Sequence, residues 1–258
     1  AVLRDVSAQV RDLIRPGHTQ GQVVGLLGPS GMGKSSLFRL MSGLERPTAG
    51  KVLVGAKQVP VRPGVVGVVG QHYPLLQHRR IGENLLLAAS QTWKRPKEAE
   101  EQARALLARF DLAERWNAWP AQLSGGQRQR VAIAQQILCS DTVLLMDEPF
   151  SGLDPLMKDE ACRLIAHVAG MSEEFTVVVV THDIASAVRV ADRLWLLGRE
   201  RGPDGAPLPG ARIVADLDLV QRGLPWRPDV EQLPQFAATV REITHMFRSL
   251  ASGVGGSR

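Results

Sequence analysis

A glycine-rich loop at residues 28–36 holds the side chains whose types and spacing are best suited to chemistry. The loop reads GPSGMGKSS, which fits the phosphate-binding spacing G-x-x-x-x-G-K-[ST]. Glycines allow backbone N–H groups to turn towards an anion, and the N-terminus of the following helix adds free donors. Lys34 supplies a point charge, and the Ser35 hydroxyl is a hard oxygen ligand of the kind that Mg²⁺ prefers. The candidate nucleotide contacts are Gly28, Pro29, Ser30, Gly31, Met32, Gly33, Lys34, Ser35 and Ser36.

Two adjacent carboxylates close the segment VLLMDE at residues 143–148, directly after its apolar part. Ligands of open α/β sheets bind at the carboxyl ends of strands, so this position favours a role in the same site. Successive side chains of a strand diverge, and we therefore expect different roles for the two acids. Asp147 is predicted to hold Mg²⁺ together with Ser35, and Glu148 to polarise a water molecule that attacks the γ-phosphate. Taken alone, the pair is equally compatible with a turn or a helix cap.

Two further polar residues stand where apolar runs end. Gln71 closes VVGVVGQ, and His182 follows VVVVT. A lone histidine is more often a surface or core residue than a catalyst. Its predicted place at the same sheet edge as Asp147 nevertheless indicates a contact with phosphate.

A second candidate anion site is the sequence LSGGQ at residues 123–127. Ser124 resembles a helix N-cap, and Gly125 and Gly126 leave backbone donors uncovered ahead of Gln127. A plain capped helix start is the alternative. The sequence SGLD, which ends at Asp154, is by itself only a turn with a helix cap.

The elements that must position these residues alternate between strand and helix. Apolar runs over residues 22–27, 65–71, 143–147 and 176–181 read as buried strands, and helical patterns separate them. This alternation indicates an α/β fold with a mixed, mainly parallel sheet. Residues 1–14 alternate loosely and predict one or two antiparallel edge strands.

We expect one domain over residues 1–258 with three parts. Residues 1–72 and 141–198 form the nucleotide-binding core. Residues 73–140 lack strand patterns and form an inserted α-helical subdomain. Residues 199–258 add a strand and a helix as a C-terminal extension.

The composition is that of an ordinary soluble protein, with 44% hydrophobic and 22% charged residues among 258. The net charge of +5 is scattered rather than massed in a stripe, so no nucleic-acid partner is expected. Cys139 and Cys162 lack metal-type spacing and read as buried reduced thiols, typical of the cytosol. No apolar stretch reaches the roughly 18 residues needed to span a bilayer, and no signal-peptide layout is present.

Together these motifs resemble the ATP-binding cassette (ABC) family. The phosphate loop, Gln71, LSGGQ, LLMDEP, SGLD and THD occur in the order and spacing of that family, over residues 1 to about 198. The resemblance implies a P-loop NTPase core of the RecA-like kind that binds and hydrolyses ATP with Mg²⁺. It also implies that Gln71 senses the metal and the attacking water, and that His182 contacts the γ-phosphate. Residues 1–27 contain no aromatic side chain to stack on adenine.

The resemblance further implies partners. Two copies would form an ATP-sandwich dimer in which Ser124, Gly125, Gly126 and Gln127 of one copy close on the nucleotide of the other, with Asp154 communicating between them. A groove near residues 71–85 would receive a helix of a transmembrane permease. A periplasmic or extracellular solute-binding protein would act indirectly, and the chain would lie at the cytoplasmic face of the bacterial inner membrane as a peripheral subunit.

The C-terminal pattern is similar to cassettes of nitrate, sulfonate and taurine importers. We therefore expect an ATPase subunit for import of a small polar solute of that kind or one related to urea or guanidine. An exporter cassette shares the same motifs and stays an alternative. A soluble ATPase of DNA repair or translation is disfavoured, because only a compact helical segment separates Lys34 from Ser124 and the chain holds one cassette. A nucleotide switch without hydrolysis is disfavoured by Glu148 and His182.

Overall fold

The computed structural model describes residues 2–11, 21–71, 73–140 and 142–251. The chain divides into two compact units, residues 1–41 with 147–258 and residues 42–146. We call the first, which contains the phosphate loop, the nucleotide unit, and the second, residues 42–146, the insert unit. None of the helices in the described parts of the chain combines the length and the hydrophobicity that a membrane span requires.

The described residues of the nucleotide unit include a row of strands in the order β6-β1-β7-β8. They are β1 (Gln22–Leu27), β6 (Thr176–Thr181), β7 (Arg193–Gly198) and β8 (Arg212–Asp218). Strand β1 runs parallel to both β6 and β7, and β8 runs antiparallel to β7. Every residue of β1 is buried, as expected for a strand covered on both faces.

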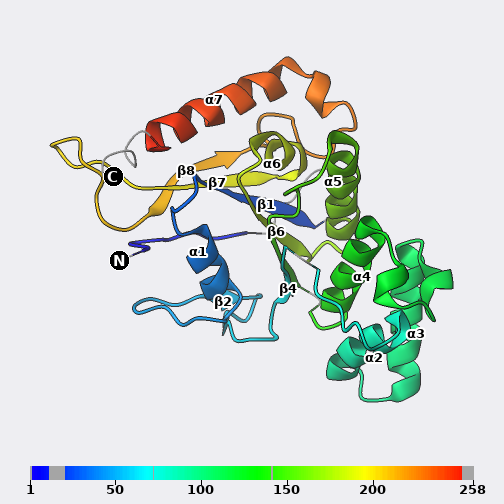
Figure 1. Cartoon of the computed structure of the whole chain (residues 1–258). Coiled ribbons are helices and arrows are strands. Elements are labelled where there is room, and N and C mark those ends of the chain that lie inside the picture. Colours follow the sequence, from blue (N-terminus) through cyan, green and yellow to red (C-terminus); the bar gives the residue numbers. More distant parts are fainter. Residues whose placement is uncertain (1, 12–20, 72, 141, 252–258) are drawn as a thin grey trace. The chain divides into compact units, whose positions relative to one another are not determined.

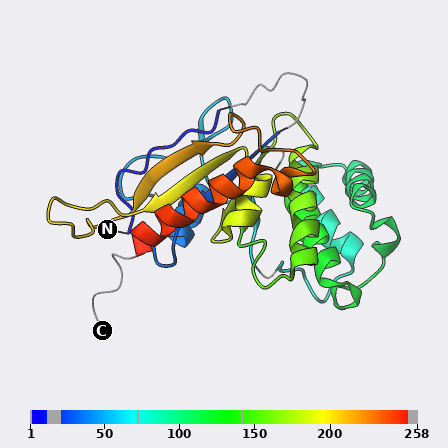
Figure 2. The same ribbon diagram turned by 90° about the horizontal axis from the view of Figure 1, so that it is seen from above.

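Helices cover both faces of these strands (Figure 1). Helix α1 (Lys34–Met41) lies on one side, and α6 (Ile184–Val190) and α7 (Pro234–Ala251) lie on the other. Helix α5 (Pro155–Ala169) contacts β1 and β6. Seen from above, α7 runs alongside β7 and β8 (Figure 2). A Cβ atom on Gly198 of β7 would lie only 2.7 Å from Leu250 Cδ2 of α7, so the helix end packs directly on the strand. A 3₁₀ turn, η3 (Val230–Gln232), precedes α7.

The insert unit combines short strands with helices. Strands β2 (Leu53–Val54) and β3 (Val59–Pro60) form a small antiparallel sheet, and β4 (Gly67–Val69) pairs in parallel with β5 (Val143–Asp147). The helices are α2 (Ile81–Thr92), α3 (Pro96–Arg109) and α4 (Gly125–Ile137), with 3₁₀ turns η1 (Ala113–Arg115) and η2 (Pro120–Gln122). The last residue of β5, Asp147, returns the chain to the nucleotide unit.

The predicted fold class is confirmed: the α/β core has mainly parallel strands, a small antiparallel sheet and a helical insertion. The edge strands predicted for residues 1–14 are wrong over residues 2–11, where the structure has a single isolated bridge, Leu3 to Ala211. Residues 12–14 lie outside the described residues. The backbone hydrogen bonds at this bridge join Arg4 N to Ala211 O and Ala211 N to Val2 O. A loose alternation is therefore not enough to form a strand here.

Candidate functional site

The phosphate loop begins where β1 ends and closes into the first turn of α1. Gly31 and Gly33 have φ angles of 79° and 85°, a left-handed region that side chains with a Cβ rarely adopt. Gly28 has a different constraint, because a Cβ there would lie 2.8 Å from the carbonyl oxygen of Leu197. The glycines therefore have steric reasons for their places, and the loop leads directly to the N-terminus of a helix.

Lys34 folds back over this loop. Its Nζ donates hydrogen bonds to Gly28 O at 2.7 Å and to Pro29 O at 3.3 Å. Burial lowers the pKa of Lys34 below its ordinary value, while the carboxylates of Glu148 and Asp147 act to raise it. Lys34 therefore lies close enough to Asp147, the last residue of β5, and to Glu148, the residue after it, to interact with both charges.

Asp147 and Glu148 have different environments, as the divergence of strand side chains predicts. Burial raises the pKa of Asp147, and the charge of Glu148 adds to that shift while Lys34 opposes it. Glu148 has a φ of 49°, which is unusual for a residue other than glycine. Its backbone N–H donates to Val180 O at 2.8 Å, which ties this strained residue to β6.

The Glu148 carboxylate is held through both oxygens. Oε1 lies 2.9 Å from Nδ1 of His182, and Oε2 accepts a hydrogen bond of 3.1 Å from the Thr181 hydroxyl. The side chain of Glu148 is 18% exposed and that of His182 is 60% exposed, so the pair sits at the surface of the unit. The strand register places Thr181 opposite Leu27, the residue before the phosphate loop.

Thr181 is a site residue that the sequence reasoning missed. The signal was present in the motif THD, whose threonine ends a strand of apolar residues. A hydroxyl at the end of such a run, fully buried in the structure, needs a hydrogen-bond partner. The partner is the carboxylate predicted to be the base.

Asp154 caps helix α5, since its Oδ1 accepts a hydrogen bond of 2.9 Å from Met157 N. The helix-cap interpretation of SGLD is therefore correct as local structure. One turn later, Lys158 forms an ion pair with Asp183, the residue after His182. The first turn of α5 and the loop after β6 are thus joined by a charge pair.

Ser124 and Gln127 belong to the insert unit and form a reciprocal capping box at the start of α4. Gln127 N donates to Ser124 Oγ at 3.2 Å, and Ser124 N donates to Gln127 Oε1 at 3.0 Å. A Cβ on Gly125 or Gly126 would meet nothing within 4 Å, so the backbone here is open to approach. Gln71 follows β4 in the same unit and is exposed.

The predicted site residues are therefore divided between the two units. The structure brings Lys34, Asp147, Glu148 and His182 together in the nucleotide unit. Gln71 and the LSGGQ sequence lie in the insert unit. Their contacts with a nucleotide stay predictions.

The comparisons with known proteins agree on one family. The ABC transporter family model matches residues 17–151. Aliphatic sulfonates import ATP-binding protein SsuB 2 of Pseudomonas aeruginosa (strain UCBPP-PA14) is 40% identical over 210 residues, which cover 81% of this chain and 70% of that protein. Aliphatic sulfonates import ATP-binding protein SsuB 3 of Pseudomonas syringae pv. syringae (strain B728a) is 41% identical over 188 residues, which cover 73% of this chain and 66% of that protein. The sulfate/thiosulfate import ATP-binding protein CysA of Mesorhizobium japonicum is 39% identical over 206 residues, which cover 77% of this chain and 57% of that protein.

Solved structures show the same fold. The chain of cbiO1 from Clostridium perfringens, part of the transporter complex cbiONQ, matches with a TM-score of 0.66 at 22% identity, over 90% of this chain and 89% of that one. The dimeric bacterial ABC transporter cassette MJ0796 matches with a TM-score of 0.64 at 27% identity, over 84% of this chain and 90% of that one. The family model and the relatives of about 40% identity, together with the phosphate loop, the paired acids and the histidine in one unit, show that the chain belongs to the ABC transporter family as an ATP-binding subunit.

Proposed function

We propose that this chain hydrolyses ATP and so drives import of a small polar solute through separate permease subunits. The observation that supports it most directly is the fixed Glu148 carboxylate, which follows the last residue of β5, Asp147, and is held by Thr181 and His182. A carboxylate in that position is a suitable general base for a water molecule. The phosphate loop and Lys34 supply the donors that bind the nucleotide phosphates.

The residues present fit a magnesium ion. Ser35 opens α1 beside the loop, and Asp147 is a half-buried carboxylate that interacts with Lys34. Mg²⁺ commonly takes one or two protein oxygens and completes its shell with phosphates and water. Ser35 and Asp147 would hold the ion, and the family resemblance assigns Gln71 as a further oxygen ligand. When bound, the ion neutralises charge on the phosphate oxygens.

The remaining roles are inferred from the family. His182 contacts the γ-phosphate through its exposed ring, while Nδ1 faces Glu148. Ser124, Gly125, Gly126 and Gln127 bind the nucleotide of a second copy, and Asp154 links the two copies. The cassette MJ0796, which is similar to this chain, is dimeric. One copy of this chain then completes the site of the other.

The partners and the solute are proposed from the relatives. The cassette cbiO1 is part of a larger transporter complex, which supports a permease as the partner and a place at the cytoplasmic face of the membrane. Two relatives import aliphatic sulfonates and one imports sulfate or thiosulfate. We therefore favour a sulfur oxyanion over nitrate and over compounds related to urea or guanidine.

Glu148→Gln tests the proposal. The amide keeps the size of the carboxylate but cannot take a proton from water, so turnover should fall about 100- to 10,000-fold while ATP still binds. ATPase rates and equilibrium nucleotide binding measure the two effects separately. Because the trapped nucleotide joins two copies, Glu148→Gln with ATP should also sediment as a dimer.

Glu160→Gln is the matched control, since Glu160 is an exposed residue of α5 outside the site. It should hydrolyse ATP at the wild-type rate. Near-normal hydrolysis by Glu148→Gln would contradict the role of Glu148. A variant that binds ATP but stays monomeric would contradict the shared nucleotide site.

A further inference from the structure

We propose that Thr181 is a positioning residue for the catalytic carboxylate. Its hydroxyl fixes the orientation of Glu148 so that the carboxylate faces the attacking water. This inference rests on the proposed function, because it assumes that Glu148 acts as the base.

The hydrogen-bond pattern around the hydroxyl gives it a single orientation. Thr181 Oγ1 accepts a hydrogen bond of 3.1 Å from the backbone N–H of Asp183. Since one lone pair is engaged there, the hydroxyl proton points away from that N–H, and it is donated to Glu148 Oε2 at 3.1 Å. A hydrogen bond to an ionised group is stronger than one between neutral groups, and burial of Thr181 excludes competing water.

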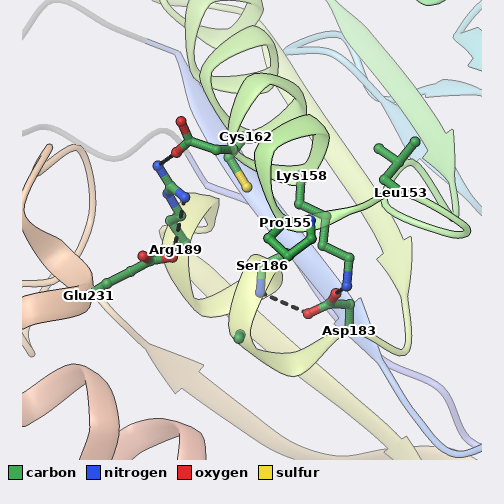
Figure 3. Close-up of a pocket in the computed structure, with 10 residues that line it drawn as sticks. Leu153, Pro155, Lys158, Cys162, Asp183, Ser186, Arg189 and Glu231 are labelled. Carbon is green, nitrogen blue, oxygen red and sulfur yellow. Dashed lines mark hydrogen bonds and ion pairs between the residues drawn. The ribbon is translucent and has the colours of Figure 1, made fainter. Parts of the chain in front are cut away.

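The backbone that carries the hydroxyl is itself anchored. Asp183 caps α6 through a hydrogen bond of 3.0 Å from Ser186 N to its Oδ1, and its Oδ2 pairs with Lys158 of α5. Figure 3 shows Lys158 reaching from its helix to Asp183, beside a cavity of about 350 Å³ that Cys162 and Arg189 also line. The loop that follows β6 is thus held from both α5 and α6.

The strain at Glu148 gives a reason for so many contacts. A φ of 49° brings the Cβ of a residue other than glycine close to its own backbone. Such a conformation persists only where the surroundings determine it. Val180 O fixes the backbone N–H, and Thr181 and His182 hold the side chain. His182 is largely exposed and is proposed to contact the γ-phosphate as well, whereas the buried Thr181 hydroxyl donates to the carboxylate alone.

Thr181→Val tests the inference because valine has nearly the same shape and lacks the hydroxyl. We expect kcat to fall about 10- to 100-fold, the effect of losing a hydrogen bond to a charged group, with ATP affinity unchanged. Thr181→Ser restores the donor and should return kcat to within about 3-fold of wild type. Thr176→Val is the matched control, since Thr176 lies at the other end of β6 and should keep the wild-type kcat.

A double-mutant cycle with Glu148→Gln separates positioning from a structural role. If the hydroxyl acts through the carboxylate, Thr181→Val should not lower the residual rate of Glu148→Gln any further. An equal fractional loss in both backgrounds would overturn the inference. So would a wild-type kcat in Thr181→Val, or in Thr181→Ala if the valine variant does not fold, because neither side chain has a donor. Full activity of Glu148→Gln would instead reject the proposed function.

Discussion

Two different groups hold the Glu148 carboxylate, a buried hydroxyl and an exposed imidazole. The buried one fixes an orientation, and the exposed one can meet the nucleotide. Next to them, Asp183 joins the loop to α5 and α6. The chemistry proposed for Glu148 would therefore depend on Thr181 and Asp183, side chains to which no nucleotide contact is assigned.

Asp183 should make folding stability depend on acidity. Burial acts to raise the pKa of Asp183, but hydrogen bonds from Lys158 and Ser186 outweigh it and hold the pKa below the ordinary 3.8. A lowered pKa means that the folded state favours the carboxylate. Its stabilising contribution is complete above the unfolded-state value and is lost as the pH falls through the folded-state value.

Asp183→Asn keeps the helix cap and removes the charge. The free energy of unfolding of wild type should exceed that of the variant by an amount that is constant above about pH 5 and shrinks at lower pH. Urea unfolding at a series of pH values measures the difference. A gap that does not change with pH would show that the ionised form of Asp183 is not favoured by folding.

Three helices that carry or adjoin candidate site residues begin with side-chain caps. Ser124, Asp154 and Asp183 each accept a hydrogen bond from the backbone N–H three residues on. Short polar residues ahead of apolar periodic runs are typical of helix starts, and the caps at Ser124 and Asp154 were predicted in this way. A residue that caps a helix stabilises the fold whether or not it also binds a ligand. An experiment therefore has to separate its effect on stability from its effect on function.

Ser124 allows that separation in helix α4. Ser124→Ala removes the cap and should lower the free energy of unfolding by about 1 kcal/mol. Ser124→Asp caps equally well but places a negative charge where a phosphate is proposed to bind. Its stability should match wild type, and its ATP-driven dimerisation and turnover should be lost. Wild-type turnover in Ser124→Asp would leave Ser124 as a cap alone.

The segment after β7 is part of the nucleotide unit. Asp192 is fully buried and joins this segment to the core: its Oδ2 accepts a hydrogen bond of 2.7 Å from Val23 N of β1, and its Oδ1 accepts one of 2.8 Å from Trp226 Nε1. Arg222 pairs with Glu242 of α7. The strand that leads to the phosphate loop is thus tied to residues about 200 positions later in the chain.

Trp226→Phe should destabilise the fold. Phenylalanine preserves most of the packing but removes one donor from a buried carboxylate, at a cost of about 1–3 kcal/mol. Thermal or urea unfolding measures the loss. Trp119→Phe is the control, because Trp119 is 40% exposed and surface changes usually stay within about 0.5 kcal/mol. A Trp226→Phe variant as stable as the control would show that this bond does not anchor the segment.

Much of the fold was predictable because its strands are short apolar runs and its helices are periodic. The runs around Val24, Leu145 and Val178 are typical of strands buried in a parallel sheet, and each of them forms a strand in the structure. The prediction of edge strands over residues 2–11 is wrong because a loose alternation does not specify a pairing partner.

The candidate site was predictable only where it is local in sequence. The spacing of the phosphate loop fixes Lys34, and the end of one apolar run fixes Asp147 and Glu148. The bond from Thr181 to Glu148 could not be predicted, because it joins side chains 33 positions apart and depends on the position of β6 in the sheet.

The left-handed backbone at Glu148 also bears on stability. Glycine adopts that φ without steric cost, so Glu148→Gly would relax the turn while removing the base. The same change would leave the buried Thr181 hydroxyl without its carboxylate acceptor and would give the unfolded chain more freedom. Relief of the backbone is therefore offset by two costs, and the strained acid persists because its own hydrogen bonds hold it.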